Sequence, residues 1–211
     1  MAGAWFWLFC FQFFVAEQIA RLGWPGRYSM TRNYISDLGS RTCALRWVMN
    51  GSFVLQGLLI LLGAVWIRGS FPARWMYRGA LLLLMVSGVG VLVVGLFPED
   101  AEFRMHLLGA VAHFLGGNLA MIVLGLAMIR RAVCSPGDRL KSWITFAAGS
   151  IGLLATLALE FRGTPSWIAL GWQVGLVERL AAYPIPLWLT WTGLRLVRES
   201  PKIAPSTGRR L

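Results

Sequence analysis

The run GALLLLMVSGVGVLVVGLF, residues 79–97, contains no ionisable side chain and decides the fold class. At about 1.5 Å per residue, a helix of this length nearly crosses the roughly 30 Å hydrocarbon core of a bilayer. The whole chain agrees, because 57% of its 211 residues are hydrophobic and only 14% are charged. Soluble domains carry roughly 25% charged residues. The composition therefore excludes an ordinary soluble protein and indicates an integral membrane protein.

Five further apolar stretches of similar length lie before and after this run. They predict helices at Ala4–Gly23, Trp47–Ile67, Met105–Ile129, Trp143–Phe161 and Gly171–Val197. The last stretch is interrupted by Glu178 and Arg179, and Pro184 and Pro186 should bend it. We expect an all-α, polytopic membrane protein whose six transmembrane helices form one bundle.

The basic residues predict which end of the bundle faces the cytoplasm. Six spans place both termini on one side, and that side would hold twelve of the 20 cations: Arg68, Arg74, Arg78, Arg130, Arg131, Arg139, Lys141, Arg195, Arg198, Lys202, Arg209 and Arg210. Because cytoplasmic loops carry an excess of Lys and Arg, we predict a multi-pass protein of the cell membrane with both termini cytoplasmic. Residues 1–200 would be the six-span domain and residues 201–211 a cytoplasmic tail. Topology then accounts for the net charge of +11, so no nucleic-acid partner is expected.

Buried ionisable residues are the strongest functional signal. Glu17 lies about seven residues below the outer end of the first span, where an unpaired carboxylate costs several kcal/mol, so it should be paired or water-exposed inside the bundle. His106 and His113 are seven residues apart on one stripe of the fourth span. With Asp37 of the first outer connection, these residues are the predicted acid–base groups, and their side chains must converge if they act together. Packing could also explain His113.

Small residues and histidine spacing leave two interpretations open. Gly109, Ala110, Gly116 and Gly117 lie on or next to the histidine stripe, where they would form a groove or simply permit close helix packing. The spacing of the histidines does not match the i, i+4 spacing of helical zinc motifs. No metal or other cofactor is predicted, although a metal held by His113 and carboxylates of other helices stays open.

Two stretches carry a family resemblance. YSMTRNYISDLGS, residues 28–40, and VGLFPEDAEFRMHLLGAVAHF, residues 94–114, resemble the prokaryotic membrane family named domain of unknown function 998, over about residues 5–197. That family is more distantly similar to the DRAM group and the GPI-lipid-remodelling Frag group. The resemblance implies six helices and, loosely, work on or around lipids. It extends to Tyr28, Ser29, Asn33, Ser36, Asp37, Gly39, Pro98, Asp100, His106 and His113.

These features together predict a polar cavity on the outer face that binds a lipid or isoprenoid-like amphiphile and carries out acid–base chemistry, as a cyclase or hydrolase would. The predicted substrate-binding residues are Arg32, Tyr28, Asn33, Ser36, Asp100, Trp188 and Trp191. Arg32 would bind an anionic head group, and Trp188 and Trp191 would line a site for an apolar chain. Turn chemistry equally explains Ser36 and Asp37, and ordinary packing equally explains the two tryptophans.

A non-enzymatic protein is the alternative. A transporter, a lipid organiser or a membrane partner subunit would use the same buried polar groups for proton coupling or helix contacts. The sequence does not decide between these classes and an enzyme, and it names no protein partner.

Overall fold

The computed structural model describes residues 2–70, 74–131, 136–162, 164 and 173–199, and this part of the chain contains helices and no strand. The long helices are α1 (Ala2–Leu8), α2 (Gln12–Arg21), α3 (Arg46–Ile67), α4 (Trp75–Leu96), α5 (Phe103–Arg131), α6 (Pro136–Leu159), α8 (Val174–Ala182) and α9 (Pro184–Glu199), with short 3-10 turns η1 (Phe9–Phe11), η2 (Ser36–Gly39) and η3 (Arg68–Ser70). The predicted tail lies outside the described residues.

The helical pattern confirms the predicted membrane bundle. Five helical segments are long and apolar enough to cross a bilayer: Ala2–Arg21, Arg46–Ile67, Trp75–Leu96, Phe103–Arg130 and Gly137–Leu159. The first of these joins α1, η1 and α2. The sixth predicted span is broken into α8 and α9 at Tyr183.

Two prolines explain this break. Pro184 and Pro186 lack the N–H groups that an unbroken helix would use to bond the carbonyls four residues earlier. A side chain from another helix contacts the backbone here, because Asn118 Nδ2 of α5 donates to Ala181 O at 2.9 Å. The predicted bend is therefore confirmed and takes the form of a helix break, next to which Asn118 of α5 donates a hydrogen bond to the backbone.

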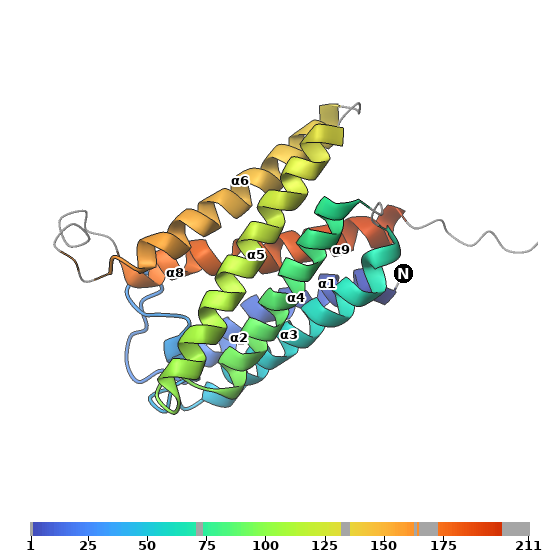
Figure 1. Ribbon diagram of the computed structural model, residues 1–211. Coiled ribbons are helices and arrows are strands. Elements are labelled where there is room, and N and C mark those ends of the chain that lie inside the picture. The colour runs from blue at the N-terminus through green and yellow to red at the C-terminus, as the bar shows by residue number, and fades with distance from the viewer. Residues whose placement is uncertain (1, 71–73, 132–135, 163, 165–172, 200–211) are drawn as a thin grey trace, which may run out of the picture.

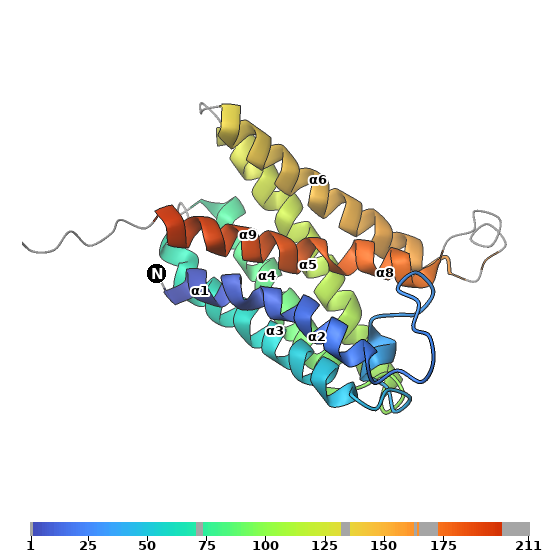
Figure 2. The same cartoon turned by 180° about the vertical axis from the view of Figure 1, so that it is seen from behind.

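The helices form a closed ring of neighbours. α3 packs between the first span and α4, α5 packs between α4 and α6, and α8 and α9 return beside α6 to contact α1. In Figures 1 and 2 the N-terminus and the end of α9 lie at one end of the bundle, which we call the terminal end. The connections 22–45 and 97–102 gather at the opposite end, which we call the loop end. The candidate site lies at the loop end.

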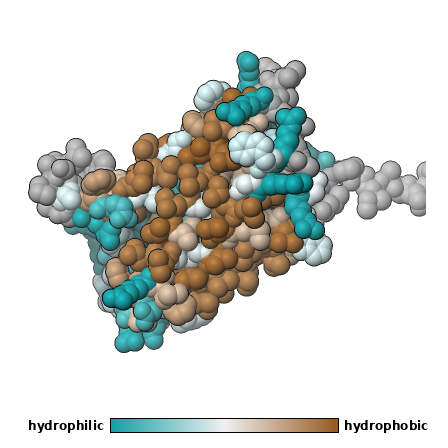
Figure 3. Space-filling view, in the orientation of Figure 1, coloured by the Kyte–Doolittle hydropathy of each residue, from teal (hydrophilic) through white to brown (hydrophobic). Residues whose placement is uncertain are grey.

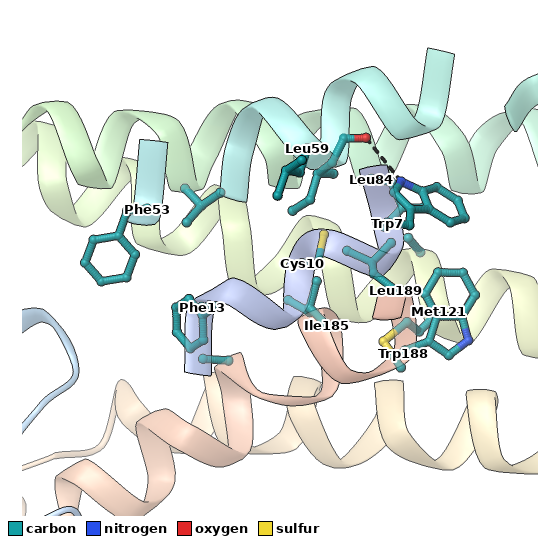
Figure 4. Close-up of a cluster of buried hydrophobic side chains, with 14 of the residues drawn as sticks. Trp7, Cys10, Phe13, Phe53, Leu59, Leu84, Met121, Ile185, Trp188 and Leu189 are labelled. Atoms are coloured by element: carbon teal, nitrogen blue, oxygen red, sulfur yellow. Dashed lines mark hydrogen bonds between the residues drawn. The ribbon is translucent and has the colours of Figure 1, made fainter. Parts of the chain in front are cut away.

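Aromatic and aliphatic side chains fill the centre of the ring (Figure 4). Trp7 of α1 is fully buried; its Nε1 donates to Ile60 O of α3 at 3.4 Å, and its ring lies 5.8 Å from that of Trp188. Outside this core, large apolar side chains such as Leu82 and Leu154 are exposed. Figure 3 shows a broad apolar band on one face of the molecule, with hydrophilic residues at both ends. This surface suits contact with acyl chains.

Glycines bring α4 and α5 unusually close. A Cβ atom added at Gly90 would lie 2.5 Å from the backbone nitrogen of His113 and 2.6 Å from the carbonyl oxygen of Gly109. Each helix thus packs a glycine directly against the backbone of the other. This contact supports the interpretation that the small residues permit close helix packing. The same contact fixes the position of His113 along the axis of α4.

Candidate functional site

Hydrogen bonds between the connections organise the loop end. Ser36 Oγ donates to Glu99 Oε2 at 2.8 Å, and Arg41 N donates to Asp100 Oδ2 at 2.7 Å. These two bonds join the connection 22–45 to the connection 97–102 between α4 and α5. Within the first connection, Asp37 Oδ2 accepts a hydrogen bond from Tyr34 N at 2.8 Å. Asp37 therefore has the local role that the turn interpretation gave it.

His106 and Glu99 form an acid–base pair at this end. His106 Nδ1 lies 3.0 Å from the carbonyl oxygen of Phe97, which can only accept, so Nδ1 carries the proton and Nε2 keeps its lone pair. Nε2 lies 4.0 Å from Glu99 Oε2. Burial raises the pKa of Glu99 to about 7, and the nearby charges of Asp37 and Asp100 add to the effect of burial against the hydrogen bond from Ser36. Near neutral pH, a basic nitrogen thus faces a carboxyl group that readily holds a proton.

A cavity of about 150 Å³ opens beside this pair. Its polar lining includes His106 and the carboxylates Glu99, Glu160 and Glu178, together with the guanidinium of Arg162. Its apolar lining comes from α5 and α6: Phe103, Leu107, Ala110, Val111, Phe114 and Leu159. We call this space the His106 cavity. Its lining therefore combines polar and apolar groups, as a binding site for an amphiphile would require.

Glu178 is the most deeply buried acid of the cavity. Only 7% of its surface is exposed, and its Oε2 accepts a hydrogen bond from the backbone N–H of Ile35. Among the residues that the structure describes, the other oxygen, Oε1, has no hydrogen-bond partner. The site therefore contains a carboxylate oxygen that has no partner in the described part of the chain and that keeps some exposed surface.

His113 lies deeper in the same region. Its Nδ1 contacts Ser87 Oγ at 2.9 Å and the carbonyl oxygen of Ser87 at 3.1 Å. His113 lines a small second cavity of about 30 Å³, whose walls also include Ser36, His106 and Glu178. The structure thus brings both predicted histidines and Ser36 to adjoining cavities, and it adds Glu99 and Glu178 to them.

Glu17 belongs to a different cluster. It is fully buried, as predicted for a paired carboxylate; its Oε1 accepts from Arg179 Nη2 at 2.7 Å and its Oε2 from Tyr183 Oη at 2.6 Å. The prediction that Glu17 is paired inside the bundle is confirmed. Its contacts are with α8 and the break before α9, whereas His113 contacts Ser87.

Arg179 also fastens the connection 22–45 to the bundle. Its Nη1 donates to the carbonyl oxygens of Met30 at 2.5 Å and Asn33 at 3.0 Å, and its Nη2 donates to Tyr28 Oη at 2.7 Å. Tyr28 Oη in turn donates to Tyr34 O at 2.7 Å. The predicted substrate-binding residue Tyr28 is thus part of a structural clamp around Arg179.

The other predicted binding residues do not line the His106 cavity. Arg32 is exposed, Asn33 Oδ1 accepts from Ser29 N at 3.0 Å, and Asp100 pairs with Arg41. Trp188 and Trp191 line an apolar groove of about 760 Å³ between α6 and α9, which diverge toward the terminal end (Figure 2). The groove is separate from the His106 cavity, and chain binding by the two tryptophans stays a prediction.

Sequence reasoning missed Glu99 and Glu178 as site residues. In the sequence, Glu178 is noticeable only as an interruption of the last span, and nothing singles out Glu99. A signal for Glu178 was present, because an acidic residue within an apolar stretch needs a polar environment. For Glu99 the deciding feature is the approach of Ser36 and His106, which spacing does not show.

Fold and site together define a multi-pass helical membrane protein with a polar cavity at one end of its bundle. The family described as "Protein of unknown function (DUF998)" matches residues 2–195, and the chain belongs to that family. No curated protein and no solved structure matches the chain. The similarity to the DRAM and Frag group is not shown by these comparisons.

Proposed function

We propose that the protein binds a lipid or isoprenoid amphiphile in the His106 cavity and carries out acid–base chemistry on it. The observation that carries this proposal is the pairing of His106 Nε2 with the Glu99 carboxyl group at 4.0 Å. Imidazole nitrogen is an effective base near neutral pH, and a carboxyl group whose pKa is about 7 is an effective acid there. Both groups line one cavity.

The cavity wall supports an amphiphile as the ligand. Phe103 and Leu107 are exposed on the outer surface of α5 and also line the cavity. Because α5 crosses the bilayer, these side chains connect the cavity with the acyl-chain region. A head group would lie near His106 and Glu99, and the first part of its chain would lie against Phe103 and Leu107.

The geometry favours proton transfer over attack by a serine. Ser36 Oγ donates to Glu99 rather than to His106, so His106 does not activate it as a nucleophile. In the proposed reaction, His106 Nε2 takes a proton from a substrate hydroxyl, an acidic carbon or a bound water. Glu99 gives a proton to the atom of the substrate that becomes basic. This exchange suits hydrolysis by water as well as an isomerisation or cyclisation.

Isotope labelling tests this function without a known substrate. We expect the purified protein, in nanodiscs of phosphatidylethanolamine, phosphatidylglycerol and an isoprenyl alcohol, to incorporate solvent deuterium at carbon or solvent ¹⁸O into one amphiphile. Mass spectrometry of the extracted lipids is the measurement. His106→Gln should slow incorporation about 10²–10⁴-fold, the usual contribution of a general acid or base. Glu99→Gln should slow it as well.

Glu102→Gln is the matched control for Glu99→Gln, because Glu102 is an exposed glutamate in the same connection. It should leave incorporation unchanged. Equal incorporation by wild type and His106→Gln would refute the proposed role of His106, and no incorporation into any of the three lipid classes would count against the chemistry.

We also propose that the loop end faces outward in the cell membrane and both termini face the cytoplasm, on the strength of the cations near the terminal end. In a chain with Cys134 replaced by serine, Glu102→Cys should react with an impermeant thiol reagent added to intact cells. Gly69→Cys, at the exposed turn between α3 and α4, should react only after the cells are opened. Labelling of Gly69→Cys alone in intact cells would invert the orientation.

A further inference from the structure

We infer that the amphiphile bound in the His106 cavity carries an ammonium head group, which Glu178 and Glu99 bind. This inference rests on the proposed function, because it names the class of amphiphile that the same cavity takes. Two independent observations support it: the charges of the lining and the unused oxygen of Glu178.

The lining is mostly acidic. Three carboxylates, Glu99, Glu160 and Glu178, share the cavity with one guanidinium, that of Arg162. Arg162 is exposed and its Nη1 donates to Leu159 O at 2.8 Å, so it lies at the rim. Glu160 is exposed and also lies at the rim. A head group that is only anionic would therefore meet the carboxyl groups of Glu99 and Glu178 inside the cavity, and contacts between like charges are strongly unfavourable wherever these groups are ionised.

Glu178 Oε1 supplies a specific acceptor. It belongs to a side chain with 7% exposure, and it has no hydrogen-bond partner in the part of the chain that the structure describes. A buried carboxylate needs a counter-charge or hydrogen bonds to be stable in its charged form. An ammonium group supplies both, since it brings a positive charge and up to three donors.

An organic cation fits better than a metal ion. Within the described ranges, no three His, Cys, Asp or Glu side chains are grouped closely enough to hold a metal. The cavity, at about 150 Å³, far exceeds the roughly 30 Å³ share of one water molecule and would hold an ethanolamine-sized group. In a zwitterionic phosphoethanolamine head, the ammonium would bind Glu178 while the phosphate would lie near Arg162 at the rim.

Binding of an ammonium group should depend on pH. The titratable and charged groups around the ligand are Tyr34, Asp37, Glu99, Asp100, His106, Glu160, Arg162, Glu178 and Arg179. Below its pKa of about 7 the Glu99 carboxyl group is neutral, so protons compete with the cation. An alkylammonium ion keeps its charge to well above pH 8, because amine pKa values of this kind lie near 10. Affinity should therefore rise between pH 6 and pH 8.

Calorimetry on the full chain in a maltoside detergent tests the inference. The probes are dodecylammonium, dodecyl phosphate, dodecanol and the soluble amine butylammonium. At pH 8 we expect dodecylammonium to bind at least about tenfold more tightly than dodecyl phosphate or dodecanol, a ratio typical of one charge-assisted hydrogen bond. Weak binding of butylammonium would identify a membrane amphiphile as the source of the ammonium group, whereas equal binding would identify a soluble amine and overturn the amphiphile assignment.

Glu178→Gln is the decisive variant, because a glutamine Oε1 can still accept the hydrogen bond from Ile35 N. It should weaken dodecylammonium binding at least about tenfold and leave dodecanol binding unchanged, whereas Glu102→Gln should change neither. If Glu178→Gln fails to fold, Glu99→Gln provides the second variant: it should weaken dodecylammonium binding at pH 8 and reduce the increase in affinity between pH 6 and pH 8.

The two proposals fail in different ways. Tightest binding of dodecyl phosphate, or wild-type dodecylammonium affinity in Glu178→Gln, would overturn the ammonium inference. His106-dependent isotope incorporation into a neutral or anionic amphiphile would do the same, and would leave the proposed acid–base function standing.

Discussion

Arg179→Met should destabilise the protein by about 3–5 kcal/mol, because it leaves the Glu17 carboxylate buried without its counter-charge. The side chains of Arg179 and Glu17 are 5% and 0% exposed, and Arg179 Nη2 lies 2.7 Å from Glu17 Oε1. The variant also removes the donors to Met30 O and Asn33 O, so the connection 22–45 loses part of its attachment to α8. Thermal unfolding and the yield of monodisperse protein in detergent are the measurements.

Two controls separate the buried pair from a general loss of charge. Arg195→Met breaks the partly exposed pair with Glu199, which joins residues four apart on α9, and should cost no more than about 0.5 kcal/mol. The double variant Glu17→Leu with Arg179→Met should recover part of the lost stability, because no uncompensated charge remains. Wild-type stability of Arg179→Met would show that Glu17 is neutral or solvated.

Gly90→Leu should have the second largest effect, because α4 and α5 would have to separate. The first atom of the new side chain would lie 2.5 Å from His113 N and 2.6 Å from Gly109 O, and both are backbone atoms that cannot turn away. Overpacking of a close contact costs typically 1–3 kcal/mol and more where the backbone must move. We expect a lower unfolding temperature, and loss of ligand binding or turnover, because His113 and His106 shift together on α5.

Gly79→Ala is the matched control for this variant. Gly79 lies in the same helix, and a Cβ atom there would meet no other atom within 4 Å. The change should be neutral or slightly stabilising, since alanine has the higher helix propensity by roughly 1 kcal/mol. An unfolding temperature for Gly90→Leu equal to that of Gly79→Ala would contradict the close packing of α4 and α5.

The sequence predicted the bundle well, because long apolar stretches have few alternatives to a helix in a bilayer. Even the break near Pro184 follows from the chemistry of one residue type. The need of Glu17 for a partner was also predictable from its depth. The identity of that partner was not, because Arg179 lies 162 residues further along the chain.

The candidate site was predicted only in part, because several of its residues lie far apart along the chain. His106 and His113 share one helix stripe, so their proximity follows from helix geometry. Glu99, Ser36 and Glu178 come from two connections and another helix, and only the packed fold brings them to the cavity. The sequence does not distinguish the roles of Asp37 and Tyr28, which belong to the same connection. In the structure, Asp37 completes a local turn and Tyr28 contacts Arg179.

The pairing of Glu17 with Arg179 also imposes an order on the synthesis of the protein. The first span leaves the ribosome before its ionic partner exists, and 162 residues must follow. At about 5–20 residues per second, that delay is on the order of ten seconds or more. During this time the Glu17 carboxyl group must stay near the membrane surface, stay protonated or be shielded by the insertion machinery. The ion pair that joins the first span to α8 can therefore form only after α8 has been synthesised.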